Sequence, residues 1–270
     1  MDKIPPLIYG TAWKEDRTAA LTIAAITAGF HGIDTANQKK HYREDFVGDA
    51  LVELKKRGIA REDLFLQSKY TYKEGQDHRL PYDPKASFAD QVRASFENSL
   101  KNLHTDHLDS YLLHGPRSGR ELMEADWEVW GAIEELHQSG KAKRIGISNV
   151  GIHQLKPLCK NARVRPQIVQ NRCYAIHGWD REVREYCLEN KIIYQGFSLL
   201  TANPHVVADP RVAVIAKRLQ VTPPQVVFCF AVQIGILPLT GTTNVQHMAE
   251  DLQVPGLALS DQDVLILTTV

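Results

Sequence analysis

The sequence has only four cysteines among its 270 residues, and none of them form a CxxC pair. Closely spaced cysteines are typical of zinc sites and of redox-active disulfides. The four residues, Cys159, Cys173, Cys187 and Cys229, are instead expected to be reduced thiols, as in proteins of the cytoplasm. The sequence therefore predicts a cytoplasmic protein without a disulfide framework or a bound metal.

Long apolar segments and an excess of charge are also missing. No run of about 18 apolar residues occurs, which is the length that a transmembrane helix requires. The N-terminal segment lacks the apolar stretch of a signal peptide. The 32 basic and 32 acidic residues give a formal net charge of zero. Nucleic acid and anionic membranes attract proteins with basic segments, so we expect neither as a partner.

Eight short apolar runs alternate with longer amphipathic segments along the chain. The runs are interpreted as strands that end near Gly10, Asp34, Lys69, His114, Ser148, Gln170, Gly196 and Pro238. Strands that alternate with helices predict a parallel α/β sheet, and eight units within about 250 residues favour a closed barrel. The GxGxxG turn that an open dinucleotide-binding sheet usually carries is absent. We therefore predict a single (β/α)8 TIM barrel over residues 1–270.

Three connections are longer than a barrel requires, namely residues 70–86, 115–122 and 199–222. Each follows a strand, which places it at the face where the strands end. Long loops at such a face usually shape a substrate pocket. The last of the three is interpreted as a polar stretch that delays the seventh helix to residues 223–233.

A single ionisable side chain ends each of three successive strands, and a tyrosine follows the first of these strands. The four residues are Asp34, Tyr42, Lys69 and His114. A closed parallel barrel brings the ends of its strands to one face, so we expect these side chains to lie together. Taken singly, each also has an ordinary interpretation: a helix cap, a loop aromatic, a solvated charge and a turn residue, respectively.

Together with their neighbours, these residues form a set that resembles the aldo-keto reductase superfamily. The set consists of residues 32–36 (Gly-Ile-Asp-Thr-Ala), Tyr42, Lys69, His114, Ser148, Asn149 and Gln170. Its members occur in order at the ends of the second to sixth strands, and the resemblance extends from Tyr9 to about Asp251. It implies an oxidoreductase that reduces small aldehydes or ketones, or oxidises the matching alcohols, with a nicotinamide dinucleotide. A monomer or weak homo-oligomer is expected.

The position of the tyrosine departs from the family pattern. The family usually places it five residues after the aspartate, whereas Lys39 stands there and Tyr42 follows Asp34 by eight residues. We interpret this as a loop, residues 37–41, that is three residues longer. One alternative is a barrel that has lost its acid and binds the dinucleotide as a redox-sensing or regulatory subunit. A barrel hydrolase or lyase without nicotinamide is the other.

The resemblance assigns acid–base roles to the four ionisable residues. Reduction of a carbonyl requires a proton donor within hydrogen-bond reach of the oxygen, with a pKa near the working pH. Tyr42 would be this donor. The ordinary pKa of a tyrosine is about 10, and the Lys69 ammonium would lower it. Asp34 would hold Lys69 charged and in place, and His114 would orient the carbonyl oxygen or share in the proton transfer.

The resemblance also implies residues that bind the dinucleotide. Ser148, Asn149 and Gln170 match positions that hydrogen-bond the carboxamide, and Tyr174 matches the aromatic that stacks on the nicotinamide ring. The segment expected to wrap the pyrophosphate, through small residues and backbone N–H groups, consists of Gly196, Phe197, Ser198, Leu199 and Leu200. The cofactor candidates on the first two strands are Gly10, Thr11, Ala12 and Asp34.

The adenosine end of the cofactor site is less typical of the family. An ungapped match places Gly241 at the motif's lysine, Thr242 at its serine and His247 at its arginine, and Glu250 and Asp251 at its Glu-Asn pair. The two cations that grip a 2′-phosphate are thus absent or weakened, because a histidine is only partly charged near neutral pH. NADP(H) is favoured, since related chains with this Gly-Thr variant resemble NADPH users, and NAD(H) is the alternative.

Aromatic residues that follow strands are candidates for the substrate pocket. Trp13 follows the first strand and Trp179 the sixth. We predict that both contact the substrate, together with Tyr42 and His114.

Overall fold

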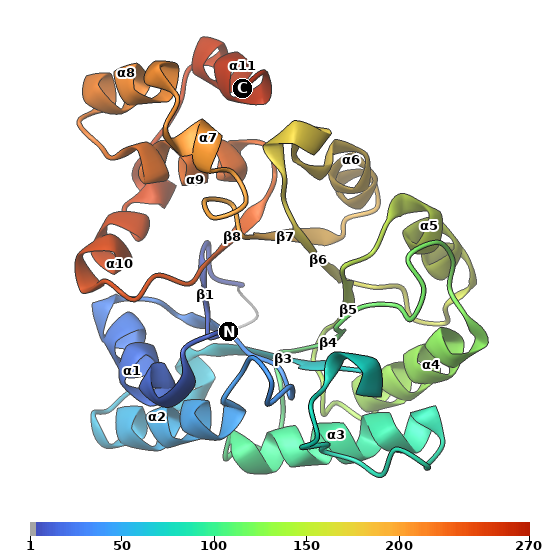
Figure 1. The fold of residues 1–270 in the computed structure, drawn as a ribbon. Coiled ribbons are helices and arrows are strands. Elements are labelled where there is room, and N and C mark those ends of the chain that lie inside the picture. Colours follow the sequence, from blue (N-terminus) through green and yellow to red (C-terminus); the bar gives the residue numbers. More distant parts are fainter. Residues whose placement is uncertain (1–3) are drawn as a thin grey trace.

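Eight parallel strands close into a barrel in which each strand pairs with the next and β8 pairs with β1 (Figure 1). The computed structural model describes residues 4–270. The strands are β1 (Ile8–Gly10), β2 (Gly32–Asp34), β3 (Phe65–Tyr70), β4 (Ser110–Leu113), β5 (Ile145–Ser148), β6 (Ile168–Arg172), β7 (Ile193–Phe197) and β8 (Leu237–Thr240). The predicted (β/α)8 barrel is therefore confirmed.

Helices surround the barrel and connect its strands (Figure 1). They are α1 (Thr18–Ala28), α2 (Glu44–Lys56), α3 (Phe88–Asn102), α4 (Glu124–Gln138), α5 (Ile152–Asn161), α6 (Arg181–Glu189), α7 (Pro204–Val207), α8 (Pro210–Leu219), α9 (Pro223–Gln233), α10 (Val245–Asp251) and α11 (Asp261–Thr268). Short 3-10 helices lie in the connections, namely η1 (Glu15–Arg17), η2 (Arg61–Asp63), η3 (Lys73–Gly75), η4 (Ala175–Asp180) and η5 (Val254–Gly256).

The barrel interior changes from apolar to polar towards the carboxyl ends of the strands. Successive side chains of a strand point to opposite faces, so alternate residues of β3 face the interior. One end of the interior is filled by an apolar cluster of Ile8, Phe65, Leu112, Ile168 and Leu239. Gln67 and Lys69 follow on the same side of β3 as Phe65 and are fully buried, whereas Leu66 packs in the larger core beneath the helices. The polar end is where the site described below lies.

The segment 199–222 is not the extended polar connection that we predicted. It contains α7 and α8, and Figure 1 shows α8 and α11 lying outside α7 and α9. The Asp209 side chain caps the N-terminus of α8, and Val212 on the inner face of this helix is buried. In the sequence, Pro204 and Pro210 suggest that helical structure is interrupted. Each instead occupies the first turn of a helix, where proline is favoured. The connection therefore adds a second helical layer outside β7 and β8.

The structure also bears on the thiols and on membrane insertion. The four cysteines are free and buried, as predicted. Burial raises the pKa of Cys173 and of Cys187 to about 12, so these thiols stay protonated and unreactive near neutral pH.

Among the residues that the structure describes, no helix has both the length and the apolar character needed to cross a bilayer.

Candidate active site

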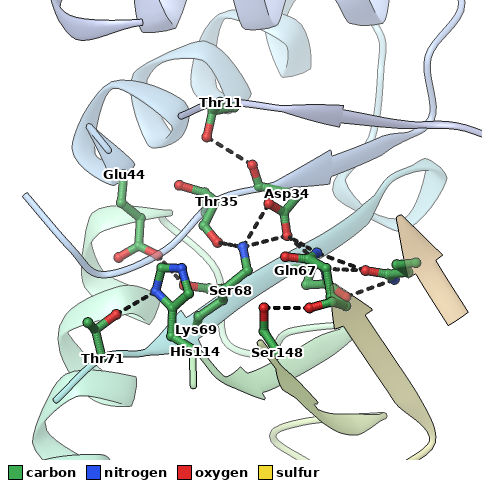
Figure 2. Close-up of polar contacts among 12 residues, drawn as sticks. Thr11, Asp34, Thr35, Glu44, Gln67, Ser68, Lys69, Thr71, His114 and Ser148 are labelled. Atoms are coloured by element: carbon green, nitrogen blue, oxygen red, sulfur yellow. Dashed lines mark hydrogen bonds and ion pairs between the residues drawn. The ribbon is translucent and has the colours of Figure 1, made fainter. Parts of the chain in front are cut away.

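Asp34 and Lys69 form a buried ion pair at the ends of β2 and β3 (Figure 2). Lys69 Nζ donates to Asp34 Oδ1 and Oδ2, both at 2.7 Å, and to the backbone oxygen of Thr35 at 2.8 Å. An ammonium has three N–H donors, so these bonds use all of them. Lys69 is 0% exposed and Asp34 is 3% exposed. The pair is therefore held in a single arrangement, shielded from water.

Three glutamines from the barrel interior fix the orientation of Asp34 (Figure 2). Gln67 Nε2 donates to Asp34 Oδ1 at 2.7 Å, and Gln170 Nε2 donates to the same oxygen at 3.0 Å. Gln195 Oε1 accepts from both amides, at 2.8 and 2.9 Å. The network connects β2, β3, β6 and β7 through one carboxylate. The sequence analysis missed Gln67 and Gln195, although each is a polar residue within an otherwise largely apolar run.

The longer loop before Tyr42 is folded back over the barrel by hydrogen bonds to its neighbours. Gln38 Nε2 donates to the backbone oxygen of Gly75 at 2.6 Å, in the loop that follows β3. The backbone N–H of Trp13 donates to the backbone oxygen of His41 at 2.7 Å. Residues 37–41 thus contact the loops after β1 and β3, and Tyr42 lines the cavity described below.

Tyr42 faces His114 and Lys69. The ring centroids of Tyr42 and His114 are 5.9 Å apart in an edge-to-face arrangement, and Lys69 Nζ lies 5.3 Å from the centre of the tyrosine ring. His114 Nδ1 is 2.7 Å from Thr71 Oγ1 (Figure 2). The structure therefore brings the four predicted ionisable residues, Asp34 included, to one place.

His114 is a neutral imidazole in this environment. Burial, with the nearby charge of Lys69 and a smaller effect of His41, holds the pKa of His114 well below 6.5. A neutral imidazole has one N–H donor and one acceptor nitrogen. Because Nδ1 is bound to the Thr71 hydroxyl, Nε2 is the ring nitrogen that is available to a ligand.

The electrostatics of Tyr42 contradict our prediction that Lys69 lowers its pKa. Burial raises the pKa of Tyr42 above 10, and the negative charge of Asp34 raises it further. The physical reason is that burial disfavours a charged phenolate and that Asp34, paired with Lys69 at 2.7 Å, adds a negative charge nearby, so that together they outweigh the stabilising effect of the Lys69 cation. Tyr42 therefore keeps its proton at neutral pH.

A second buried carboxylate, Glu44, lies behind Lys69. Its Oε1 accepts a hydrogen bond from Ser68 Oγ (Figure 2), and its Oε2 accepts one from Asn102 Nδ2 at 3.3 Å. Burial lowers the pKa of Lys69, and the charges of Asp34 and Glu44 oppose this lowering. The two carboxylates therefore help Lys69 to stay a cation within the barrel.

A cavity of about 880 Å³ opens beside these residues. This lies within the range of about 300–1,000 Å³ that is typical of ligand and cofactor sites. The predicted residues that line it are Gly10, Ala12, Trp13, Asp34, Tyr42, His114, Ser148, Asn149, Gln170, Phe197, Ser198, Leu199, Leu200, Gly241, Thr242, His247, Glu250 and Asp251. The cavity thus extends from the ends of β4, β5 and β6 to α10.

Three residues predicted to bind the cofactor do not line this cavity. Thr11 is buried, and its Oγ1 donates to the backbone oxygen of Asp34 at 2.9 Å, so it connects β1 to β2. Gly196 packs against Ile236 on the outside of the barrel. Tyr174 does not line the cavity either, although its hydroxyl lies 3.4 Å from Arg172, which does. The placement of Tyr174 therefore does not support its predicted stacking on a nicotinamide ring, and Phe197 at the end of β7 is an aromatic that lines the cavity.

Trp179 does not reach the cavity either, so its predicted contact with substrate is wrong. The side chain is 1% exposed. Its ring packs against Phe230 at 5.1 Å between centroids, and its Nε1 donates to the backbone oxygen of Leu267 at 3.1 Å. Gly178, Trp179 and Asp180 have positive φ angles of 66°, 58° and 54°. This turn directs the indole into the core beneath α9 and α11.

Ten residues that line the cavity were not predicted from the sequence. Four of them are Lys14, Gln38, His41 and Arg172, and the others are Thr201, Thr222, Pro224, Phe228, Leu239 and Thr240. The His41 ring stacks on Trp13 with the centroids 3.9 Å apart, and the Arg172 guanidinium lies 5.5 Å from the centre of the Phe197 ring. A sequence signal was present for Gln38 and His41, because both belong to the loop before Tyr42. Lys14 directly follows Trp13, which gives no signal by itself.

Comparison with known protein families identifies one match. A model described as "Aldo/keto reductase family" matches residues 6–270. Among curated proteins, glyoxal reductase of Bacillus subtilis is 30% identical over 241 residues, which are 89% of this chain and 79% of that protein. Aldo-keto reductase family 1 member C18 of Rattus norvegicus is 29% identical in an alignment of 296 positions, gaps included, which covers 98% of this chain and 87% of that protein.

Solved structures give the same match. An aldo/keto reductase from Brucella melitensis superposes with a TM-score of 0.83 and 26% identity, covering 98% of this chain and 95% of that one. The aldo-keto reductase AKR2E5 of the silkworm, Bombyx mori, superposes with a TM-score of 0.83 and 27% identity, covering 98% and 84%. A second structure of AKR2E5, at 26% identity, is complexed with NADPH.

Proposed function

Because the chain belongs to the aldo/keto reductase family, we propose that it transfers a hydride between NADP(H) and an aldehyde, a ketone or the matching alcohol. The observation that carries this proposal is the buried Asp34–Lys69 pair beside Tyr42 and His114 at one end of the cavity. A protonated phenol and a neutral imidazole converge there on space large enough for a substrate.

The cavity fits a nicotinamide dinucleotide. Its lining combines amide and hydroxyl side chains with a buried ammonium, that of Lys14. When bound, the dinucleotide supplies the hydride, which no side chain provides. Ser148, Asn149 and Gln170 would hold the carboxamide, and Phe197 would lie against the ring. NADP(H) is favoured over NAD(H) because the complex of a similar reductase holds NADPH.

The side chains would supply the proton and position the carbonyl. Tyr42 would donate its Oη proton to the carbonyl oxygen as the hydride reaches the carbon. His114 Nε2 would orient that oxygen, since Nδ1 is bound to Thr71. The Lys69 charge would then stabilise the phenolate that forms, and Asp34 would keep Lys69 in place. Positioned proton transfer of this kind typically contributes about 10²–10⁴-fold in rate.

The body of the substrate would extend into a smaller cavity that adjoins the first at His114. This cavity has a volume of about 340 Å³, and Thr71, Glu74 and Arg117 are among the residues that line it. Glu74 and Arg117 form an ion pair at 2.7 Å on its rim. The two loops that contribute these residues follow β3 and β4, so variation of these loops would change specificity without changing the acid–base groups.

The proposal predicts dinucleotide-dependent reduction by the purified protein. A panel of small aldehydes, aromatic aldehydes and sugars, each tested with NADPH and with NADH, measures consumption of the dinucleotide and formation of the alcohol. We expect turnover of at least one class, faster with NADPH. Dinucleotide binding without turnover across the panel would favour a redox-sensing or regulatory subunit. Metal-dependent turnover without a dinucleotide would favour a hydrolase or lyase.

The rate of reduction at saturating dinucleotide is expected to be independent of pH between about pH 7 and 9. Tyr42 must be protonated to donate, and its pKa lies above 10. His114 stays neutral because its pKa lies well below 6.5. Rates for an uncharged aldehyde, measured at constant ionic strength, check this. A decline with an apparent pKa inside the window would show that the phenol is acidified in the working complex, against our assignment.

A further inference from the structure

Lys14 is a buried lysine that points into the cavity from the loop after β1. The residue is 6% exposed, although it carries an ammonium, and it lines the cavity. Its neighbours Trp13 and Glu15 have φ angles of 60° and 50°, in the left-handed region that non-glycine residues rarely adopt. Such backbone conformations cost free energy and occur preferentially at functional sites. The loop is therefore built in a way that turns the side chain of Lys14 inward.

The two buried lysines of the described chain differ in their partners. Lys69 is paired with a carboxylate at 2.7 Å. Lys14 Nζ donates to the backbone oxygen of Gly241 and lies 5.9 Å from the centre of the Tyr9 ring. Within residues 4–270, Lys14 forms no ion pair with a carboxylate. A buried charge without a counter-charge is unfavourable unless a ligand provides one, so the environment of Lys14 is suited to an anion.

The position of Lys14 is coupled to the absence of a side chain at Gly241. A Cβ added at position 241 would lie 3.4 Å from Lys14 Nζ, which is close contact. The ammonium of Lys14 thus lies directly beside the position where a side chain at 241 would begin. The family motif has its lysine at this position, and this chain has a glycine. A cation from the loop after β1 therefore stands where the one after β8 is missing.

We propose that Lys14 is the phosphate-binding cation of the dinucleotide site and that it replaces, from the opposite wall, the lysine missing at position 241. This inference rests on the proposed function, because the dinucleotide is the phosphate-bearing ligand. The phosphate is either the 2′-phosphate of NADP(H) or the pyrophosphate that both dinucleotides share. Nearby, Arg17 adds positive charge, whereas Glu250 and Asp251 line the same part of the cavity with carboxylates. Lys14 is thus the cation that offsets these carboxylates when a phosphate binds.

Calorimetric titration of the whole protein with NADPH and NADH tests the proposal without measuring turnover. Lys14→Met keeps the length of the side chain and removes its charge, and we expect it to weaken NADPH binding by about 10- to 100-fold, as for a lost charged hydrogen bond. A selective loss for NADPH assigns Lys14 to the 2′-phosphate, and an equal loss for both assigns it to the pyrophosphate. Unchanged affinity for both would overturn the proposal.

Three controls separate charge from structure. Lys55→Met removes an exposed lysine of α2, far from the cavity wall, and is expected to change neither affinity. NADPH binding to the wild type should weaken more with added salt than binding to Lys14→Met, because salt screens a charge contact. The double variant Lys14→Met/Gly241→Lys should recover NADPH affinity. Failure to recover it would contradict the proposal that Lys14 replaces a lysine at position 241. If the wild type binds neither dinucleotide, the proposed function fails first and this inference fails with it.

Discussion

Tyr42→Phe is expected to reduce turnover by about 10²–10⁴-fold while it leaves the affinity for NADPH almost unchanged. The substitution removes only the hydroxyl group. The ring would keep its edge-to-face contact with His114, and the loop would keep the hydrogen bonds of Gln38 and His41 to their backbone partners. The loss of turnover therefore measures the contribution of the Tyr42 proton, because the shape of the site is unchanged. Steady-state rates and a binding titration on the same preparation measure the two effects.

A matched control is Tyr174→Phe, which removes the hydroxyl of a tyrosine that does not line the cavity. This hydroxyl makes one long contact, 3.4 Å to Arg172, so both turnover and binding are expected to stay within about twofold of the wild type. Retention of full turnover by Tyr42→Phe would remove Tyr42 from its role. A loss of equal size in both variants would point to a general effect of removing a tyrosine hydroxyl.

Lys69→Met is expected to lower the free energy of unfolding by roughly 3–5 kcal/mol and to abolish measurable turnover. The substitution leaves the Asp34 carboxylate buried, 3% exposed, without its cation, although two glutamine amides still donate to it. It also removes the charge that stabilises a phenolate at Tyr42. Urea denaturation followed by circular dichroism measures the first effect, and the reduction assay measures the second.

The double variant Lys69→Met/Asp34→Asn separates the loss of stability from the loss of turnover. Replacement of both members of a buried ion pair usually costs much less stability than removal of one. The amide oxygen that takes the place of the carboxylate can still accept from Gln67 and Gln170. We therefore expect the double variant to regain most of the lost stability and none of the lost turnover. Recovery of turnover would show that the ion pair serves folding alone.

The barrel was predictable from the sequence because each strand–helix unit has its own apolar pattern. The helix Pro223–Gln233 has the predicted bounds, and the strands ending at Asp34 and Ser148 end as predicted. The segment 199–222 was not predictable in the same way. Its short helices begin with proline, which is common in loops as well, so local sequence does not distinguish the two outcomes.

The clustering of the four ionisable residues was predictable from the sequence, but their electrostatics were not. A closed barrel brings the ends of its strands together, so the sequence order of Asp34, Lys69 and His114 was sufficient to place them. The direction of the Tyr42 pKa shift was not predictable. It depends on how closely Asp34 neutralises Lys69 and on how far water is excluded, and both are properties of the packed structure.

The position of a predicted binding residue could be predicted from the sequence when the residue ends a strand, and could not when it lies in a turn beyond the strand. Ser148 and Gln170 end strands and line the cavity as expected. Tyr174 and Trp179 both follow β6, and the left-handed residues of the turn at Trp179 direct its indole into the core, away from the cavity. Lys14 was missed because a lone lysine beside a tryptophan is an ordinary surface residue until its burial is known.

The glutamine network has a consequence for how this scaffold can diversify. One oxygen of Asp34 accepts hydrogen bonds from residues on β3 and β6, and Gln195 of β7 joins the two donors. The proposed reactive centre thus rests on side chains of the closed sheet, whereas the entrance above it is made by loops. Changes in the loops after β3 and β4 can therefore alter which substrates fit without moving Asp34 or its hydrogen-bond partners.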